Sequence, residues 1–67
     1  MIQSVRFLRT KYNNISALDW LAKHKMQPLK QVDVGANWLR YRISPPNATG
    51  TYKSLHITPE IYIVYLS

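Results

Sequence analysis

The chain has 67 residues, 46% of them hydrophobic, so it is long enough for one small domain and too apolar to remain disordered. It contains no cysteine, which excludes disulfides and thiolate metal sites. Its two histidines and three acidic residues are too few for a structural zinc site, and we expect neither metal nor cofactor. Nine Lys/Arg against three Asp/Glu give a net charge of +6, which favours an anionic partner, with nucleic acid first and an acidic protein surface second. Solubility alone is the plainer explanation of the charge.

No apolar run has the length of a signal peptide, and none approaches the roughly 20 residues that span a bilayer. We therefore expect an intracellular protein without membrane contact.

The first elements in the chain are a strand and a short helix. Residues 2–9 alternate apolar and basic side chains, which is typical of a strand. Ser16 is the expected N-cap of a helix over residues 16–25, with Asp19 in the position of a capping box and Ile15 placed to form a hydrophobic staple with Trp20. Pro28 prevents the helix from resuming.

Residues 30–43 are typical of a β-hairpin whose loop is Gly35-Ala36. That loop would set Val32 opposite Leu39 and would place both valines, Val32 and Val34, on the apolar face. The other face would carry the basic side chains of the second strand. A slip of one residue would bury those charges, so the alternation supports this choice of faces.

Residues 44–55 contain prolines and a glycine, and we expect a loop there with a mobile tip at residues 47–51. Residues 61–66 are apolar on both faces, which suits a central strand or one covered by a partner, and a homodimer through this C-terminal strand is a further hypothesis. Together these elements predict a single α+β domain over residues 1–67. Its order would be β-α-β-β-β, a mostly antiparallel sheet of about four strands with one helix packed on one face.

The most specific feature is the strand that contains Trp38, Arg40 and Arg42. Side chains two apart share one face of a strand, so an aromatic ring and two guanidinium groups would lie together. Bases stack on aromatic rings and arginine binds phosphate bidentately, so the face suits nucleic acid. The alternative is that Trp38 packs on the sheet while Asp33 pairs diagonally with Arg40.

A second basic group consists of Arg6, Arg9 and Lys11, on or just after the first strand. Arg6 would extend the same positive face if that strand lies beside the hairpin. Charges that protect an edge strand from aggregation are the alternative. We find no nucleophile elbow, glycine-rich phosphate loop or metal-ligand spacing, and we do not expect an enzyme.

The spacing of Ser16-Ala17, Trp20-Leu21, His24, Pro28, Lys30, Asp33, Asn37, Arg40 and Arg42 resembles that of a group of short proteins from phages and large DNA viruses. The resemblance covers the chain from about residue 12 to residue 65, and it implies a viral context without a mechanism. It would place the protein in the host cell cytoplasm or within a virion.

Two functions are therefore expected from the sequence. The first is a small basic accessory protein, viral in origin, that binds DNA or RNA with the Trp38, Arg40 and Arg42 face. The second is a viral protein-interaction module, a virion component or an inhibitor of a host protein, that makes no nucleic-acid contact.

Overall fold

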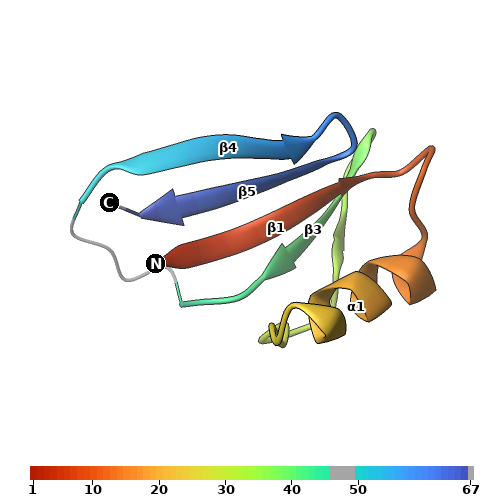
Figure 1. Cartoon of the computed structure of the whole chain (residues 1–67), viewed down its shortest axis with the longest axis horizontal. Helices are drawn as coiled ribbons and strands as arrows, with labels where there is room; N and C mark the ends of the chain where they lie inside the picture. The colour runs from red at the N-terminus through yellow and green to blue at the C-terminus, as the bar shows by residue number, and fades with distance from the viewer. Residues whose placement is uncertain (46–49, 67) are drawn as a thin grey trace.

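The computed structural model describes residues 1–45 and 50–66, and in these the chain forms one helix and five strands. The strands are β1 (Ile2–Leu8), β2 (Asp33–Val34), β3 (Trp38–Arg42), β4 (Tyr52–Thr58) and β5 (Ile61–Leu66), and the helix is α1 (Asn14–Lys23). The strands pair antiparallel in one sheet of order β2-β3-β1-β5-β4. The α+β class and the single covering helix are confirmed, and the sheet has five strands where about four were expected (Figure 1).

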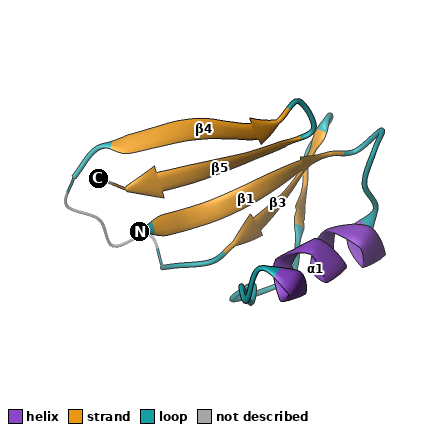
Figure 2. Cartoon of the chain, in the orientation of Figure 1, coloured by secondary structure: helices purple, strands orange, loops and turns teal. Residues whose placement is uncertain are grey.

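The core lies between the helix and one face of the sheet. Its buried side chains are Val5, Phe7, Ala17, Leu21, Leu39, Tyr41 and Ile61. Phe7 occupies the middle of this cluster, with its ring edge-on to Tyr41 at 5.5 Å and to Trp20 at 5.5 Å between centroids. Figure 2 shows α1 beneath the β1 and β3 side of the sheet and away from β4. Leu39 and Tyr41 of the hairpin therefore pack in the core as the sequence predicted, with Val32 and Ile43 partly buried against it.

The helix begins earlier than expected. Asn13 is the N-cap, and its side chain accepts a hydrogen bond from the Ser16 amide at 2.8 Å while the Ser16 hydroxyl accepts from the Asn13 amide at 3.0 Å. This is a reciprocal capping box in which Ser16 holds the N3 position. The prediction that Ser16 caps the helix was wrong, and so was the staple, because Ile15 is 80% exposed.

The hairpin register differs from the prediction by two residues. Asp33 lies opposite Arg40 and Val34 opposite Leu39, and the Gly35 amide donates to the Trp38 carbonyl at 2.9 Å. The two-residue loop is thus formed by positions 36 and 37, one step later than expected. A shift of two leaves every side chain on its predicted face. Val34 nevertheless is exposed, because the helix does not reach the short strand β2.

The predicted loop over residues 44–55 was too long. Residues 52–58 form β4, an edge strand that pairs with β5 through a tight turn at Pro59-Glu60. Side chains on an edge strand are mostly exposed, so β4 lacks the apolar alternation that marks a buried strand. Most of the loop tip that we expected to be mobile lies outside the described residues.

The C-terminal strand β5 lies inside the sheet. The sequence had left two possibilities, a central strand or a strand covered by a partner, and the first is the one observed. It pairs with β1 on one side and with β4 on the other. Edge-to-edge pairing with a second copy through β5 is therefore not open, since the free edge on that side of the sheet belongs to β4.

The helix ends in a Schellman motif that places Lys25 in the left-handed region, with φ at 60°. The Met26 amide donates to the Leu21 carbonyl at 2.9 Å, and the Lys25 amide donates to the Ala22 carbonyl at 3.1 Å. Glycine is the usual residue at this position because a Cβ is strained there.

We predict that Lys25→Gly raises the free energy of unfolding by about 1 kcal/mol, since the relief of left-handed strain exceeds the added chain entropy of glycine. Urea denaturation measures the change. Lys25→Ala is the matched control, because it removes the same charge and keeps the Cβ. Equal stability of the glycine and alanine variants would contradict the assignment of strain to Lys25.

Candidate nucleic-acid interface on the helix-free face

A single row of side chains crosses the sheet face that the helix does not cover. The pairing places Arg40 opposite both Asp33 and Arg6, and Tyr62 opposite both Arg6 and His56. Each of the five strands thus contributes one residue to the row, in the order Asp33, Arg40, Arg6, Tyr62, His56. We call this surface, with the neighbouring Ser4, Trp38, Arg42 and Val64, the helix-free face.

The alternation of each strand accounts for the row. Arg6 lies between Val5 and Phe7, and Arg40 lies between Leu39 and Tyr41, all four of which are buried under the helix. Because neighbours in a strand point to opposite faces, burial of these four directs both arginines to the other side. The prediction that Arg6 extends the positive face of the hairpin strand depended on β1 lying beside β3, and the pairing has that arrangement.

Three aromatic rings lie together at one end of the face. The Trp38 ring is edge-on to Tyr62 at 4.8 Å between centroids, and His56 lies 4.9 Å from Tyr62. Arg6 joins them, because its Nη1 donates to the Tyr62 hydroxyl at 2.9 Å and its guanidinium carbon lies 5.4 Å from the centroid of that ring. Trp38 is half-buried, so it packs on its neighbours and also presents part of its ring to solvent.

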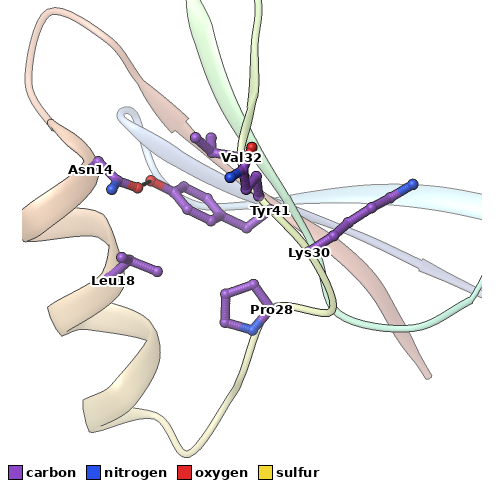
Figure 3. A pocket seen from close by; sticks show the side chains of 7 residues that line it. Asn14, Leu18, Pro28, Lys30, Val32 and Tyr41 are labelled. Atoms are coloured by element: carbon purple, nitrogen blue, oxygen red, sulfur yellow. Dashed lines mark hydrogen bonds between the residues drawn. The ribbon is translucent and has the colours of Figure 1, made fainter.

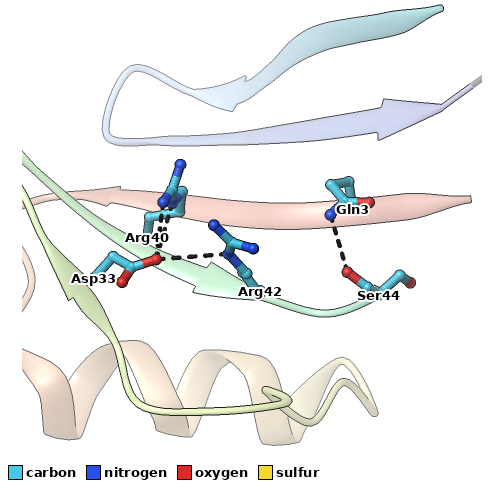
Figure 4. Close-up of polar contacts among 5 residues, drawn as sticks. All are labelled: Gln3, Asp33, Arg40, Arg42 and Ser44. Atoms are coloured by element: carbon cyan, nitrogen blue, oxygen red, sulfur yellow. Dashed lines mark hydrogen bonds and ion pairs between the residues drawn. The ribbon is translucent and has the colours of Figure 1, made fainter. Parts of the chain in front are cut away.

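Asp33 holds the two arginines of β3. Its Oδ2 accepts from Arg40 Nη2 at 2.9 Å and from Arg40 Nε at 3.2 Å, and it lies 3.7 Å from Arg42 Nε (Figure 4). The hydrogen bond from Arg40 is the largest cause that lowers the pKa of Asp33 below its ordinary value. Desolvation of the carboxylate opposes it, and the positive charges of Arg40, Arg42 and Lys30 lower the pKa further. The sequence analysis gave this ion pair as the alternative to ligand binding, and it expected Asp33 to lie diagonally across from Arg40. The two residues instead lie directly opposite each other.

Two hollows lie on the helix-free face and share Arg6 and Arg40. The first, the arginine hollow, has a volume of about 280 Å³, and its lining includes Ser4, Arg6, Arg40, Arg42, Tyr52 and Val64. The second, the tryptophan hollow, has a volume of about 390 Å³, and its lining includes Arg6, Asp33, Gly35, Asn37, Trp38 and Arg40. Each hollow therefore combines guanidinium groups with an aromatic ring.

Arg9 and Lys11 do not join the row. Arg9 Nη1 donates to the Gly35 carbonyl at 2.6 Å and to the Ala36 carbonyl at 3.3 Å, so this side chain secures the hairpin loop. Lys11 lies exposed in the turn between β1 and α1 and makes no ion pair with any described residue. Of the six predicted site residues, the structure brings four together: Arg6, Trp38, Arg40 and Arg42.

Tyr62 and His56 belong to the face and were not among the predicted site residues. The sequence of residues 52–66 allowed the face of each side chain to be assigned by alternation, but alternation does not say which strands lie side by side. The pairing of β1 with β5 joins residues more than 50 positions apart, and only the fold supplies it. Ser4, which is buried beneath the arginine hollow, was missed for the same reason.

Residues 1–45 and 50–66 hold no cluster of three His, Asp or Glu side chains that could bind a metal ion. No helix in that part of the chain has the length and apolar character needed to cross a membrane. Comparison with known proteins found no protein-family model, no curated protein and no solved structure that matches this chain.

We predict that the Asp33 carboxyl titrates below its ordinary pKa when followed by carbon NMR, because Arg40 hydrogen-bonds to it. A lowered folded pKa means that the ion pair stabilises the fold above the unfolded pKa and that this contribution is lost as the pH falls through the folded pKa. In Arg40→Gln the midpoint should rise, because the first hydrogen-bond donor to Asp33 is gone. An unchanged midpoint in that variant would show that Arg40 does not perturb Asp33.

Proposed function

We propose that this chain binds nucleic acid through the helix-free face. In this proposal Arg40, Arg42 and Arg6 contact phosphates, and Trp38 stacks on a base. The observation that carries it is the cross-strand row, which sets guanidinium groups beside aromatic rings on an uncovered sheet. Sheets with exposed aromatic side chains are a recurrent platform for single-stranded nucleic acid.

The charges support this proposal over simple solubility. Charges that serve solubility alone are usually dispersed, whereas three of the nine basic residues share one face and line one hollow. Asp33 offsets only one of these three charges, so the face keeps an excess of positive charge. The resemblance to short proteins of phages and large DNA viruses would make the chain an accessory protein of a viral genome.

Binding of labelled single-stranded DNA should weaken steeply with salt, with a slope of about −2 in log K against log salt, because three arginines would neutralise about three phosphates and each contributes about −0.7. Arg42→Gln should weaken binding and reduce the slope by about 0.7, which corresponds to one phosphate. Fluorescence anisotropy at several salt concentrations measures both quantities.

Lys23→Gln is the matched control for Arg42→Gln. It removes one charge from the helix, on the other side of the sheet, where Lys23 is exposed and pairs with Asp19 at 3.0 Å. Trp38→Leu should cost about 1–3 kcal/mol of binding, while Trp38→Phe keeps an aromatic ring and should cost less. An equal loss from Lys23→Gln and Arg42→Gln would mean that net charge, and not the helix-free face, binds the nucleic acid.

A second candidate function is a protein-interaction module that uses the opposite side of the molecule. A hollow of about 410 Å³ lies between the helix and the segment before β2, and its lining includes Asn14, Leu18, Pro28, Lys30, Val32 and Tyr41 (Figure 3). The Tyr41 hydroxyl donates to Asn14 Oδ1 at 2.8 Å across it. Ile15 and Leu29, each next in sequence to a lining residue, are exposed apolar side chains. Exposed apolar residues beside a hollow are typical of protein-binding surfaces.

If this second function holds, the chain should retain a defined protein partner after nuclease treatment. Leu18→Asp should abolish that association, because it places a charge in an apolar hollow, and Arg42→Gln should leave it intact. Co-purification of the two variants under identical conditions measures the difference. Loss of the partner on nuclease treatment would instead attribute the association to bound nucleic acid.

A further inference from the structure

The two hollows on the helix-free face differ in chemistry and lie on opposite sides of the same pair of arginines. The arginine hollow is lined by three guanidinium groups, by the buried Ser4 and by the partly buried Val64. The tryptophan hollow has an indole ring, the hairpin loop and a single carboxylate, that of Asp33. A ligand that occupied both would need an anionic part and a flat part joined by a short chain.

Building on the proposed function, we propose that the arginine hollow binds a backbone phosphate and that the tryptophan hollow binds an unpaired base of the same strand. The ligand is thereby specified as a single strand, and the face as a site for a short run of nucleotides. Asp33 is the protein's own anion in this site, and it competes with the phosphate for Arg40 and Arg42.

The arginine hollow suits a phosphate because its guanidinium groups keep free donors. A guanidinium group has five N–H donors, and the contacts of Arg42 with Asp33 consist of one approach of 3.7 Å, longer than a hydrogen bond. Its planar fork matches the oxygens of a phosphate. Arg6 and Arg40, on adjacent strands and directly opposite each other, supply further positive charge at the same hollow.

The tryptophan hollow suits a base because the half-buried Trp38 forms one wall and the backbone of the hairpin loop forms another. A Cβ on Gly35 would lie 3.3 Å from the Trp38 carbonyl oxygen, tighter than most such contacts, so the absence of a side chain there keeps the loop close to the strand. The volume of about 390 Å³ lies within the range of small-molecule sites.

The spacing of the two hollows selects a single strand. Trp38 and Arg42 are four residues apart on β3, about 13 Å along the strand, a distance that a short oligonucleotide spans. In a duplex the bases are stacked and paired inside, and extruding one costs a few kcal/mol. A single strand has unpaired bases available and avoids that cost.

Proton–nitrogen NMR of the whole chain separates the two hollows when three probes are titrated: thymidine, inorganic phosphate and a thymidine trinucleotide. Thymidine should shift the Trp38 indole N–H, and inorganic phosphate should shift the Arg42 Nε–H. The trinucleotide should shift both signals and bind at least tenfold more tightly than either part, because the two contacts are linked. The Lys23→Gln protein serves as the control and should behave as the unmodified chain does.

Asp33→Asn tests the competition. The variant should bind inorganic phosphate several-fold more tightly, because Arg40 and Arg42 lose their anionic neighbour. Arg42→Gln should weaken the shift that inorganic phosphate produces at the Arg40 Nε–H, which lines the same hollow, and should keep the thymidine shift of the Trp38 indole N–H. A weaker affinity for phosphate in Asp33→Asn would overturn the competitive role of Asp33.

The outcomes distinguish this inference from the proposed function. If long oligonucleotides bind with the expected salt dependence but the trinucleotide leaves the Trp38 or the Arg42 signal unchanged, the two-hollow site is wrong and the proposed function stands. Duplex DNA that binds as tightly as single strands overturns the two-hollow site in the same way. If no oligonucleotide binds at low salt, both the site and the proposed function fail.

Discussion

Arg6 and Arg40 lie directly opposite each other on neighbouring strands, and this juxtaposition of like charges governs the arrangement of the helix-free face. Two guanidinium groups in adjacent positions of a sheet repel each other and destabilise the pairing unless something offsets them. Asp33 does so on one side by bonding to Arg40, and Tyr62 does so on the other by accepting a hydrogen bond from Arg6. The row therefore runs from a carboxylate through two cations to a phenol.

The same arrangement leaves Arg6 incompletely satisfied. Its Nε is buried and has no hydrogen-bond partner among the described residues. A buried polar atom without a partner is unfavourable, so the rest of the structure must hold it there. Val5 and Phe7 do this, because their side chains fill the core and Arg6 between them must point to the opposite face. Burial of Val5 and Phe7 on the helix side of β1 thus fixes Arg6 on the opposite face of the sheet. Core packing and the candidate site are two consequences of one alternating strand.

The sequence predicted well those features that depend on neighbours in the chain. The faces of β3 and the identity of Leu39 and Tyr41 as core residues follow from alternation alone, and both are confirmed. A helix over about ten residues follows from the apolar stripe, although its start was misplaced because both Asn13 and Ser16 are good capping residues. The sequence contains the two halves of a reciprocal cap, and only the backbone decides which half is the N-cap.

Features that depend on distant parts of the chain were beyond the sequence. The strand β4 has few apolar contacts to preserve, since Leu55 is 53% exposed and Ile57 is 49% exposed, and its pattern therefore resembled a loop. The hydrogen bond from Arg6 to Tyr62 likewise requires that β1 lies beside β5, which no local sequence pattern indicates. Four of the six predicted site residues come together, and three of these four share one strand. Arg9 was predicted to bind a ligand, but its side chain instead secures the hairpin loop.

The position of β5 between β1 and β4 determines the order in which this protein can assemble. The strands β1 and β5 are neighbours although they are far apart in the sequence, so the sheet stays divided until β5 docks between β1 and β4. Until then β1 exposes one edge with unpaired backbone groups, and the row across the helix-free face has no Tyr62 to receive Arg6. Closing so long a loop slows folding relative to a protein built from local hairpins. Completion of the core by Ile61 and completion of the basic face by Tyr62 consequently depend on the same pairing of β1 with β5.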